Sequence, residues 1–146
     1  MSLRPPAVKQ GVTNKCWAAC MEGWSYISWY WPNTGQDVFV QKYGSTGGAL
    51  DARSTQFAQF VQDWNLGMAF YDAGQFTASA ASSLINSDWG YFMFIEMQGP
   101  GASHARLAFD VINGQIRAME PADGQPDFIV GPPDGLGKLM ILSPAL

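Results

Sequence analysis

The sequence predicts an α+β fold in which helices precede an antiparallel sheet along the chain. Apolar residues recur at helical spacing up to about residue 85, whereas short strand-like segments begin after residue 90. Between two of these segments, Asn113-Gly114 is a strong signal for a two-residue hairpin turn. Helices first and strands last are typical of an antiparallel sheet packed against helices, and 146 residues suffice for one domain with a buried core.

The first expected helix has apolar and aromatic residues nearly all round, which predicts that it is buried. It starts at Cys16, after an irregular proline-containing segment, and runs to about Tyr30, before Pro32 ends it. Thr77 is a suitable N-cap for a later helix. The helices expected after the first one cover residues 37–43, residues 54–65 and a segment that begins near residue 77.

The second part of the chain changes to the periodicity of strands. We expect a hairpin around Asn113-Gly114, and a last strand after the Pro- and Gly-rich segment 131–135. The expected strands are residues 91–98, 105–112, 115–120 and 136–142.

Composition excludes several classes of protein. The apolar fraction is 47%, which argues against a disordered chain, and the net charge of −4 leaves no basic stripe for nucleic acid. The apolar runs are too short for a transmembrane segment, and residues 1–6 lack the apolar core of a signal peptide. We expect a monomer that does not bind nucleic acid and has no transmembrane segment.

Two cysteines and one histidine limit the chemistry of the chain. Cys16 and Cys20 lie one turn apart on a single helix, where a disulfide is unfavourable, so both thiols are expected to be free. One histidine and two cysteines give no convincing metal site, and no cofactor is expected. Cys20 is expected to be a small packing residue inside the helix.

The pairing of Cys16 with the single histidine, His104, suggests a cysteine nucleophile. A thiol attacks as thiolate, and a helix N-terminus and a neighbouring imidazolium are two ways to favour that form. Cys16 stands where a helix should begin, and only His104 can supply the imidazole. The alternative for both residues is an ordinary role in the core.

Several short motifs extend this pattern in a fixed order, and together they resemble compact bacterial papain-like cysteine peptidases. Among these, plant-pathogen effector proteases and the peptidase domains that trim double-glycine leaders are the most similar in pattern. The resemblance covers roughly residues 9–120, and its most specific part is the glutamine placed six residues before Cys-Trp-Ala-Ala. The motifs are Gln10 to Lys15-Cys16-Trp17-Ala18-Ala19-Cys20, Tyr43-Gly44 to Gly47-Gly48-Ala49-Leu50, Gly99-Pro100-Gly101 to His104, and Glu120-Pro121.

The resemblance implies a papain-like fold, with the cysteine on an N-terminal central helix, further helices, and then the sheet. It implies a single cysteine peptidase domain over residues 1–146. It assigns the nucleophile to Cys16, the acid–base to His104 and an oxyanion donor to Gln10, beside the backbone N–H of Cys16. The residue that orients the imidazole corresponds to Glu120, where relatives use Asp or Asn, and Asp123 is the alternative.

Other residues are expected around a substrate cleft. Gly47 and Gly48 either line the groove or only turn the chain, and Trp17 either borders the cleft or seals its wall. Arg106 lies two residues after His104, so on an alternating strand it shares the histidine's face and could contact substrate or Glu120. The implied substrate is a peptide or protein, cut by a bacterial enzyme that is either secreted as an effector or part of a larger protein.

Three further interpretations stay open at this point. The same thiol chemistry serves deamidases, acyltransferases and peptidoglycan amidases. A papain-like module can also bind a leader or partner peptide without cutting it. The aromatic cluster around Trp29 is compatible with a carbohydrate-binding domain, in which neither thiol has a special role.

Overall fold

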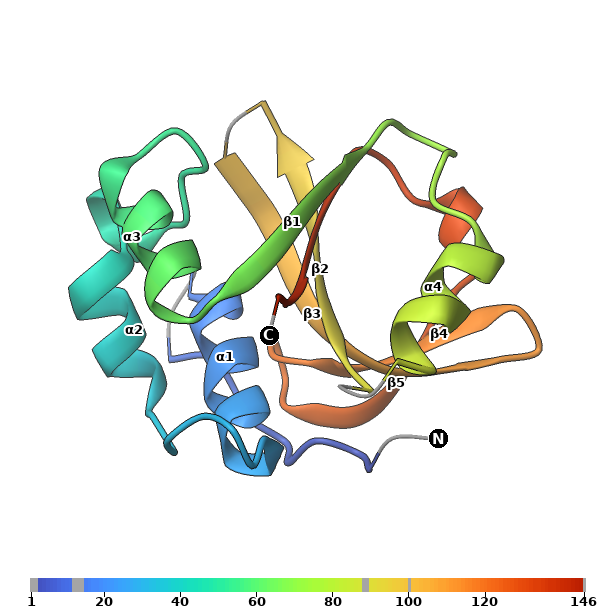
Figure 1. Cartoon of the computed structure of the whole chain (residues 1–146), viewed down its shortest axis with the longest axis horizontal. Helices are drawn as coiled ribbons and strands as arrows, with labels where there is room; N and C mark the ends of the chain where they lie inside the picture. The colour runs from blue at the N-terminus through green and yellow to red at the C-terminus, as the bar shows by residue number, and fades with distance from the viewer. Residues whose placement is uncertain (1–2, 12–14, 88–89, 100, 146) are drawn as a thin grey trace.

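The computed structural model describes residues 3–11, 15–87, 90–99 and 101–145, and Pro100 of the third motif lies outside these residues. The helices come first along the chain and most of the strands come last (Figure 1). The helices are α1 (Cys16–Ile27), α2 (Gln36–Tyr43), α3 (Thr55–Asp63) and α4 (Ala78–Ile85), with 3-10 turns at Thr46–Gly48 and Pro133–Gly135. The strands are β1 (Leu66–Tyr71), β2 (Phe92–Gln98), β3 (Gly101–Ile112), β4 (Gln115–Glu120), β5 (Gln125–Gly131) and β6 (Leu139–Pro144).

These strands form one sheet in the order β1-β6-β2-β3-β4-β5, and every neighbouring pair is antiparallel. The predicted α+β class is therefore confirmed. Helices cover both faces of the sheet, with α1, α2 and α3 on one side and α4 on the other (Figure 1). Strand β2 shows this directly, because Met93 and Ile95 pack with α1 while Phe92 and Phe94 pack with α4.

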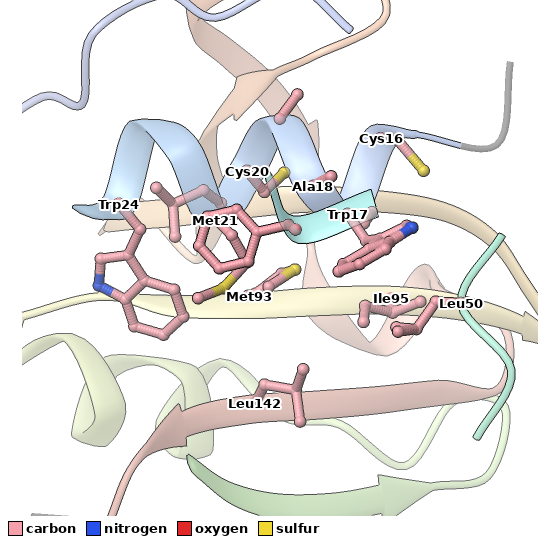
Figure 2. Close-up of a cluster of buried hydrophobic side chains, with 14 of the residues drawn as sticks. Cys16, Trp17, Ala18, Cys20, Met21, Trp24, Leu50, Met93, Ile95 and Leu142 are labelled. Atoms are coloured by element: carbon pink, nitrogen blue, oxygen red, sulfur yellow. The ribbon is translucent and has the colours of Figure 1, made fainter. Parts of the chain in front are cut away.

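Helix α1 is the central helix, and its residues pack into the larger of two apolar clusters. Trp17, Met21 and Trp24 have no exposed surface and lie over Met93 and Ile95 of the sheet (Figure 2). Burial of each such side chain contributes roughly 1.5–3 kcal/mol. The packing thus fixes the position of the helix, including its first residue.

The helix ends three residues before the predicted end at Tyr30. Ser28 has an extended backbone, and both its N–H and its hydroxyl donate to the carbonyl of Trp24. The chain then turns so that Trp31 packs edge-on against Trp24 and against Trp64. Aromatic packing of Trp31 across the turn therefore replaces a further helical turn.

Other boundaries differ in ways that matter for the site. Strand β3 begins at Gly101 instead of residue 105, so His104 lies within the strand. The predicted Asn113-Gly114 turn is confirmed, with φ values of 54° and 75°, and it joins β3 to β4. Thr77 caps α4 as predicted, since its side chain accepts from the N–H of Ala80.

Strands β1 and β5 were not predicted from the sequence. Both are edge strands of the sheet, and neither shows a clean alternation of buried and exposed residues. Strand β1 leaves Phe70 62% exposed, and β5 contains a proline that an edge strand tolerates. Their pairing partners, rather than their own periodicity, make them strands.

Candidate active site

Cys16 is the first residue of α1 and is 5% exposed. The next residue, Trp17, anchors this end of the helix, because it is fully buried and its indole N–H donates to the carbonyl of Gly48 at 3.0 Å. In Figure 2 the indole of Trp17 points toward Ile95 and Leu50, whereas the sulfur of Cys16 lies apart from the other labelled side chains, at the start of the helix. The thiol is thus held at the end of a rigid helix, outside the apolar cluster's centre.

The electrostatics of this helix end favour an anion. A helix N-terminus carries roughly half a positive charge from its unpaired backbone N–H groups. The first turn of α1 holds no acidic side chain, and Lys15 occupies the N-cap without a side-chain hydrogen bond to the helix. A negative charge on Cys16 therefore has the helix dipole on its favourable side.

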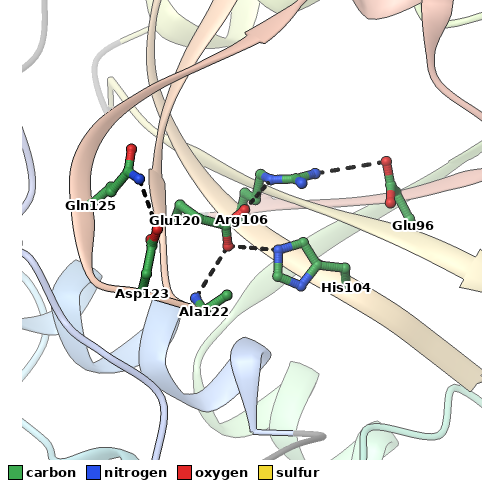
Figure 3. Close-up of polar contacts among 7 residues, drawn as sticks. All are labelled: Glu96, His104, Arg106, Glu120, Ala122, Asp123 and Gln125. Carbon is green, nitrogen blue, oxygen red and sulfur yellow. Dashed lines mark hydrogen bonds and ion pairs between the residues drawn. The ribbon is translucent and has the colours of Figure 1, made fainter.

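His104 connects this thiol to a carboxylate. Its Nε2 lies 2.6 Å from Oε2 of Glu120 (Figure 3). The ring is also near enough to the side chain of Cys16 for that thiol to be the largest cause of its raised pKa. The imidazole side chain is 22% exposed. The structure therefore brings Cys16, His104 and Glu120 together from α1, β3 and the end of β4.

The hairpin explains why two residues sixteen positions apart meet. Strands β3 and β4 are an antiparallel pair joined by the Asn113-Gly114 turn. Beyond a bulge in β3, Leu107 pairs with Met119. Continuing that register by one residue sets Arg106 opposite Glu120. The next side chain on the same face of β3 is His104, which the longer arm of a glutamate reaches.

The hydrogen bonds of this site set its charges. The hydrogen bond with Cys16, and then that with Glu120, raises the pKa of His104 from 6.5 to about 9. Burial alone would raise the pKa of Glu120, but hydrogen bonds from His104 and Arg106 lower it from 4.5 to about 2. At neutral pH the site therefore holds an imidazolium beside an ionised carboxylate.

Two other predicted residues lie next to this site. The backbone N–H of Gln10 donates to the carbonyl of Pro121 at 2.8 Å, which brings the segment before α1 to the end of β4. Asp123, the alternative to Glu120, accepts from the amide of Gln125 at 2.7 Å instead (Figure 3). Of the two carboxylates, only Glu120 contacts His104.

The predicted cleft residues have definite structural positions. Gly47 and Gly48 have φ values of 74° and 82°, a backbone region that favours glycine. A Cβ on Gly48 would also lie 3.1 Å from Val40. Trp17 has no exposed surface, so any effect of Trp17 on a substrate passes through the Gly48 carbonyl that it holds.

Cys20 has a different environment from Cys16. It is fully buried one turn further along α1, and burial raises its pKa well above the ordinary value. Both thiols are free. Cys20 is therefore a packing residue that stays protonated, and it serves as a natural control for Cys16.

Sequence reasoning missed Glu96 as a member of this charged cluster. Glu96 lies on β2 opposite His104, and its carboxylate is 3.7 Å from the guanidinium of Arg106 (Figure 3). The available signal was a single carboxylate in a strand that is otherwise apolar up to Gln98 at its end. Within the described ranges, no three His, Cys, Asp or Glu side chains gather as a metal-binding group, and no helix is long and apolar enough to cross a membrane.

A solved structure has the same overall fold. The chain resembles the peptidase domain of Streptococcus ComA, a bifunctional ABC transporter involved in a quorum-sensing pathway, with a TM-score of 0.65 and 12% sequence identity. The alignment covers 97% of this chain and 99% of the ComA domain. This chain has a papain-like peptidase fold. No family model and no curated protein matches its sequence.

Proposed function

We propose that this chain is a papain-like thiol hydrolase, a single peptidase domain over residues 1–146 that cuts peptide bonds through Cys16. The observation that carries the proposal is the arrangement from the helix N-terminus to the sheet, in which His104 bonds Glu120 and interacts with the thiol of Cys16. The fold shared with a peptidase domain supports the same assignment.

The resting charges suit this chemistry. With its pKa near 9, His104 is an imidazolium at neutral pH, and an imidazolium stabilises a thiolate on the adjacent Cys16. Glu120 lies against Nε2 of the ring and keeps the imidazole oriented. The resting enzyme thus holds a nucleophile and a proton donor side by side.

The reaction proceeds in two half-reactions. The Cys16 thiolate attacks the carbonyl carbon of the substrate amide, and the oxyanion is held by the Cys16 N–H and the amide of Gln10. The C–N bond breaks as His104 gives its proton to the leaving amine, which leaves a thioester. Neutral His104 then takes a proton from water, the hydroxide adds to the thioester, and the C–S bond breaks to restore thiolate and imidazolium.

A peptide-library digestion, read by mass spectrometry, tests this function. We expect cleavage by the wild type, loss of cleavage in Cys16→Ala, and retention in Cys20→Ala, which changes the buried thiol of the same helix. Cleavage that survives in Cys16→Ala would refute the mechanism.

The same assay separates the other uses of this chemistry. Conversion of side-chain amides to acids without chain cleavage, dependent on Cys16, would identify a deamidase instead of a peptidase. Peptides retained by the wild type but neither cut nor modified would identify a binding module.

A further inference from the structure

The carboxylate of Glu120 is divided between two partners on β3. Its Oε2 accepts from Nε2 of His104 at 2.6 Å and from the N–H of Ala122 at 3.2 Å. Its Oε1 accepts from Nε of Arg106 at 2.8 Å. Because each oxygen has its own donor, rotation of the carboxylate would break the hydrogen bonds to both side chains at once.

Arg106 is itself held in place on its far side. Its guanidinium lies 3.7 Å from Oε1 of Glu96 and 5.5 Å from the centroid of the Phe128 ring. Its side chain is only 17% exposed. The guanidinium is therefore fixed by contacts from β2, β4 and β5, and its hydrogen bond is directed at Glu120 (Figure 3).

We propose that Arg106 is a positioning residue of this site, which holds the Glu120 carboxylate so that Oε2 stays against His104. The inference rests on the proposed function for its meaning in catalysis, but the contact itself can be tested without a substrate. In this proposal Arg106 acts on His104 through the carboxylate of Glu120, and no contact between Arg106 and substrate is required.

The surroundings explain why Glu120 needs such a partner. A glutamate that is 7% exposed pays a desolvation cost when it is ionised, and an arginine hydrogen bond offsets that cost. The charged and titratable groups around it are His104 and Arg106 on β3, Cys16 and Cys20 on α1, and Glu96 on β2 beyond the guanidinium. Arg106 is the permanent cation among them.

The test is an NMR titration of the imidazole, which is unambiguous because the chain has one histidine. Arg106→Met is compared with Arg117→Met in protein without a histidine tag. Arg117 is a matched control, since it makes a similar pair with Asp127 at 2.7–2.8 Å and is 25% exposed. Its carboxylate partner does not contact His104.

Loss of the guanidinium is expected to raise the pKa of Glu120. We expect the His104 resonance of Arg106→Met to show a carboxylate inflection between about pH 3 and pH 5, which is absent from the wild type and from Arg117→Met. The value of kcat should fall about tenfold in Arg106→Met, the effect of losing one charge-assisted hydrogen bond. Arg106→Lys keeps the charge and should recover part of both effects, and it replaces Arg106→Met if that variant does not fold.

A double variant decides whether Arg106 acts through the carboxylate. In a Glu120→Gln background, Arg106→Met should no longer produce the inflection. The proposal is wrong if Arg106→Met titrates like Arg117→Met, or if its effect on His104 is the same with and without Glu120. Because the titration uses no substrate, a chain that lacked hydrolytic activity would still give one of these results.

Discussion

Glu120→Gln is the substitution that most sharply tests the charge state of the site. The amide keeps an oxygen that can accept from Nε2 of His104, but it carries no charge. In the wild type the pKa of His104 is raised from 6.5 to about 9, a change worth about 3 kcal/mol at 1.36 kcal/mol per unit. The hydrogen bond with Cys16 makes the largest contribution, and Glu120 supplies the next.

We therefore expect Glu120→Gln to lower the pKa of His104 by about one unit or slightly more, which corresponds to about 1.4–2 kcal/mol. The NMR titration of the single histidine measures this directly, and the alkaline limb of kcat/KM should move down by the same amount. Asp127→Asn is the control, because Asp127 also pairs with arginine but does not touch His104. A midpoint near 9 in Glu120→Gln, or an equal fall in both variants, would refute the reasoning.

Two further predictions concern stability. Because the pKa of Glu120 is lowered from 4.5 to about 2, its contribution is present above pH 4.5 and is lost as the pH falls toward 2. Denaturant unfolding should show about 3 kcal/mol of acid destabilisation that Glu120→Gln lacks, and equal pH dependence of both proteins would contradict this. Trp17→Phe removes the hydrogen bond to Gly48 and part of a buried ring, so it should lower the free energy of unfolding by about 2 kcal/mol. An unchanged urea midpoint would show that the indole does not hold this turn.

The stability of the folded state also depends on pH at the alkaline end of the range. The raised pKa of His104 stabilises the folded state below pH 6.5, and this contribution is lost as the pH rises through about 9. Since the carboxylate contribution is complete above pH 4.5, the pair stabilises the fold most between pH 4.5 and 6.5. The two shifts share the contact between His104 and Glu120, so they are not added together.

Much of the fold could be predicted from the sequence, and so could the approach of Glu120 to His104. The helix start at Cys16 follows from its apolar pattern, and the Asn113-Gly114 turn folds β4 back along β3, which brings Glu120 into the neighbourhood of His104. Whether Glu120 or Asp123 makes the contact could not be predicted, because a bulge in β3 shifts the register. The length and direction of each side chain then determine which of the two carboxylates, Glu120 or Asp123, contacts His104.

Other features depend on contacts that a single sequence does not reveal. Glu96 reaches Arg106 only through the pairing of β2 with β3, which contains its own irregularity after Glu96. The edge strands β1 and β5 depend in the same way on their partners, because their own residues do not alternate. The periodicity of apolar residues predicts helices and strands that bury one regular face. The register between neighbouring strands depends on how the sheet is assembled, so it cannot be predicted from that periodicity.

Alkylation of Cys16 at pH 6 tests the central claim most directly. At this pH less than about 1% of an unperturbed thiol is thiolate, so fast reaction requires a stabilising environment. In Cys20→Ala protein, which leaves Cys16 as the single thiol, iodoacetamide should label at least about tenfold faster than in Cys20→Ala/His104→Asn. Equal, slow labelling of both proteins would contradict an imidazolium-stabilised nucleophile at the start of α1.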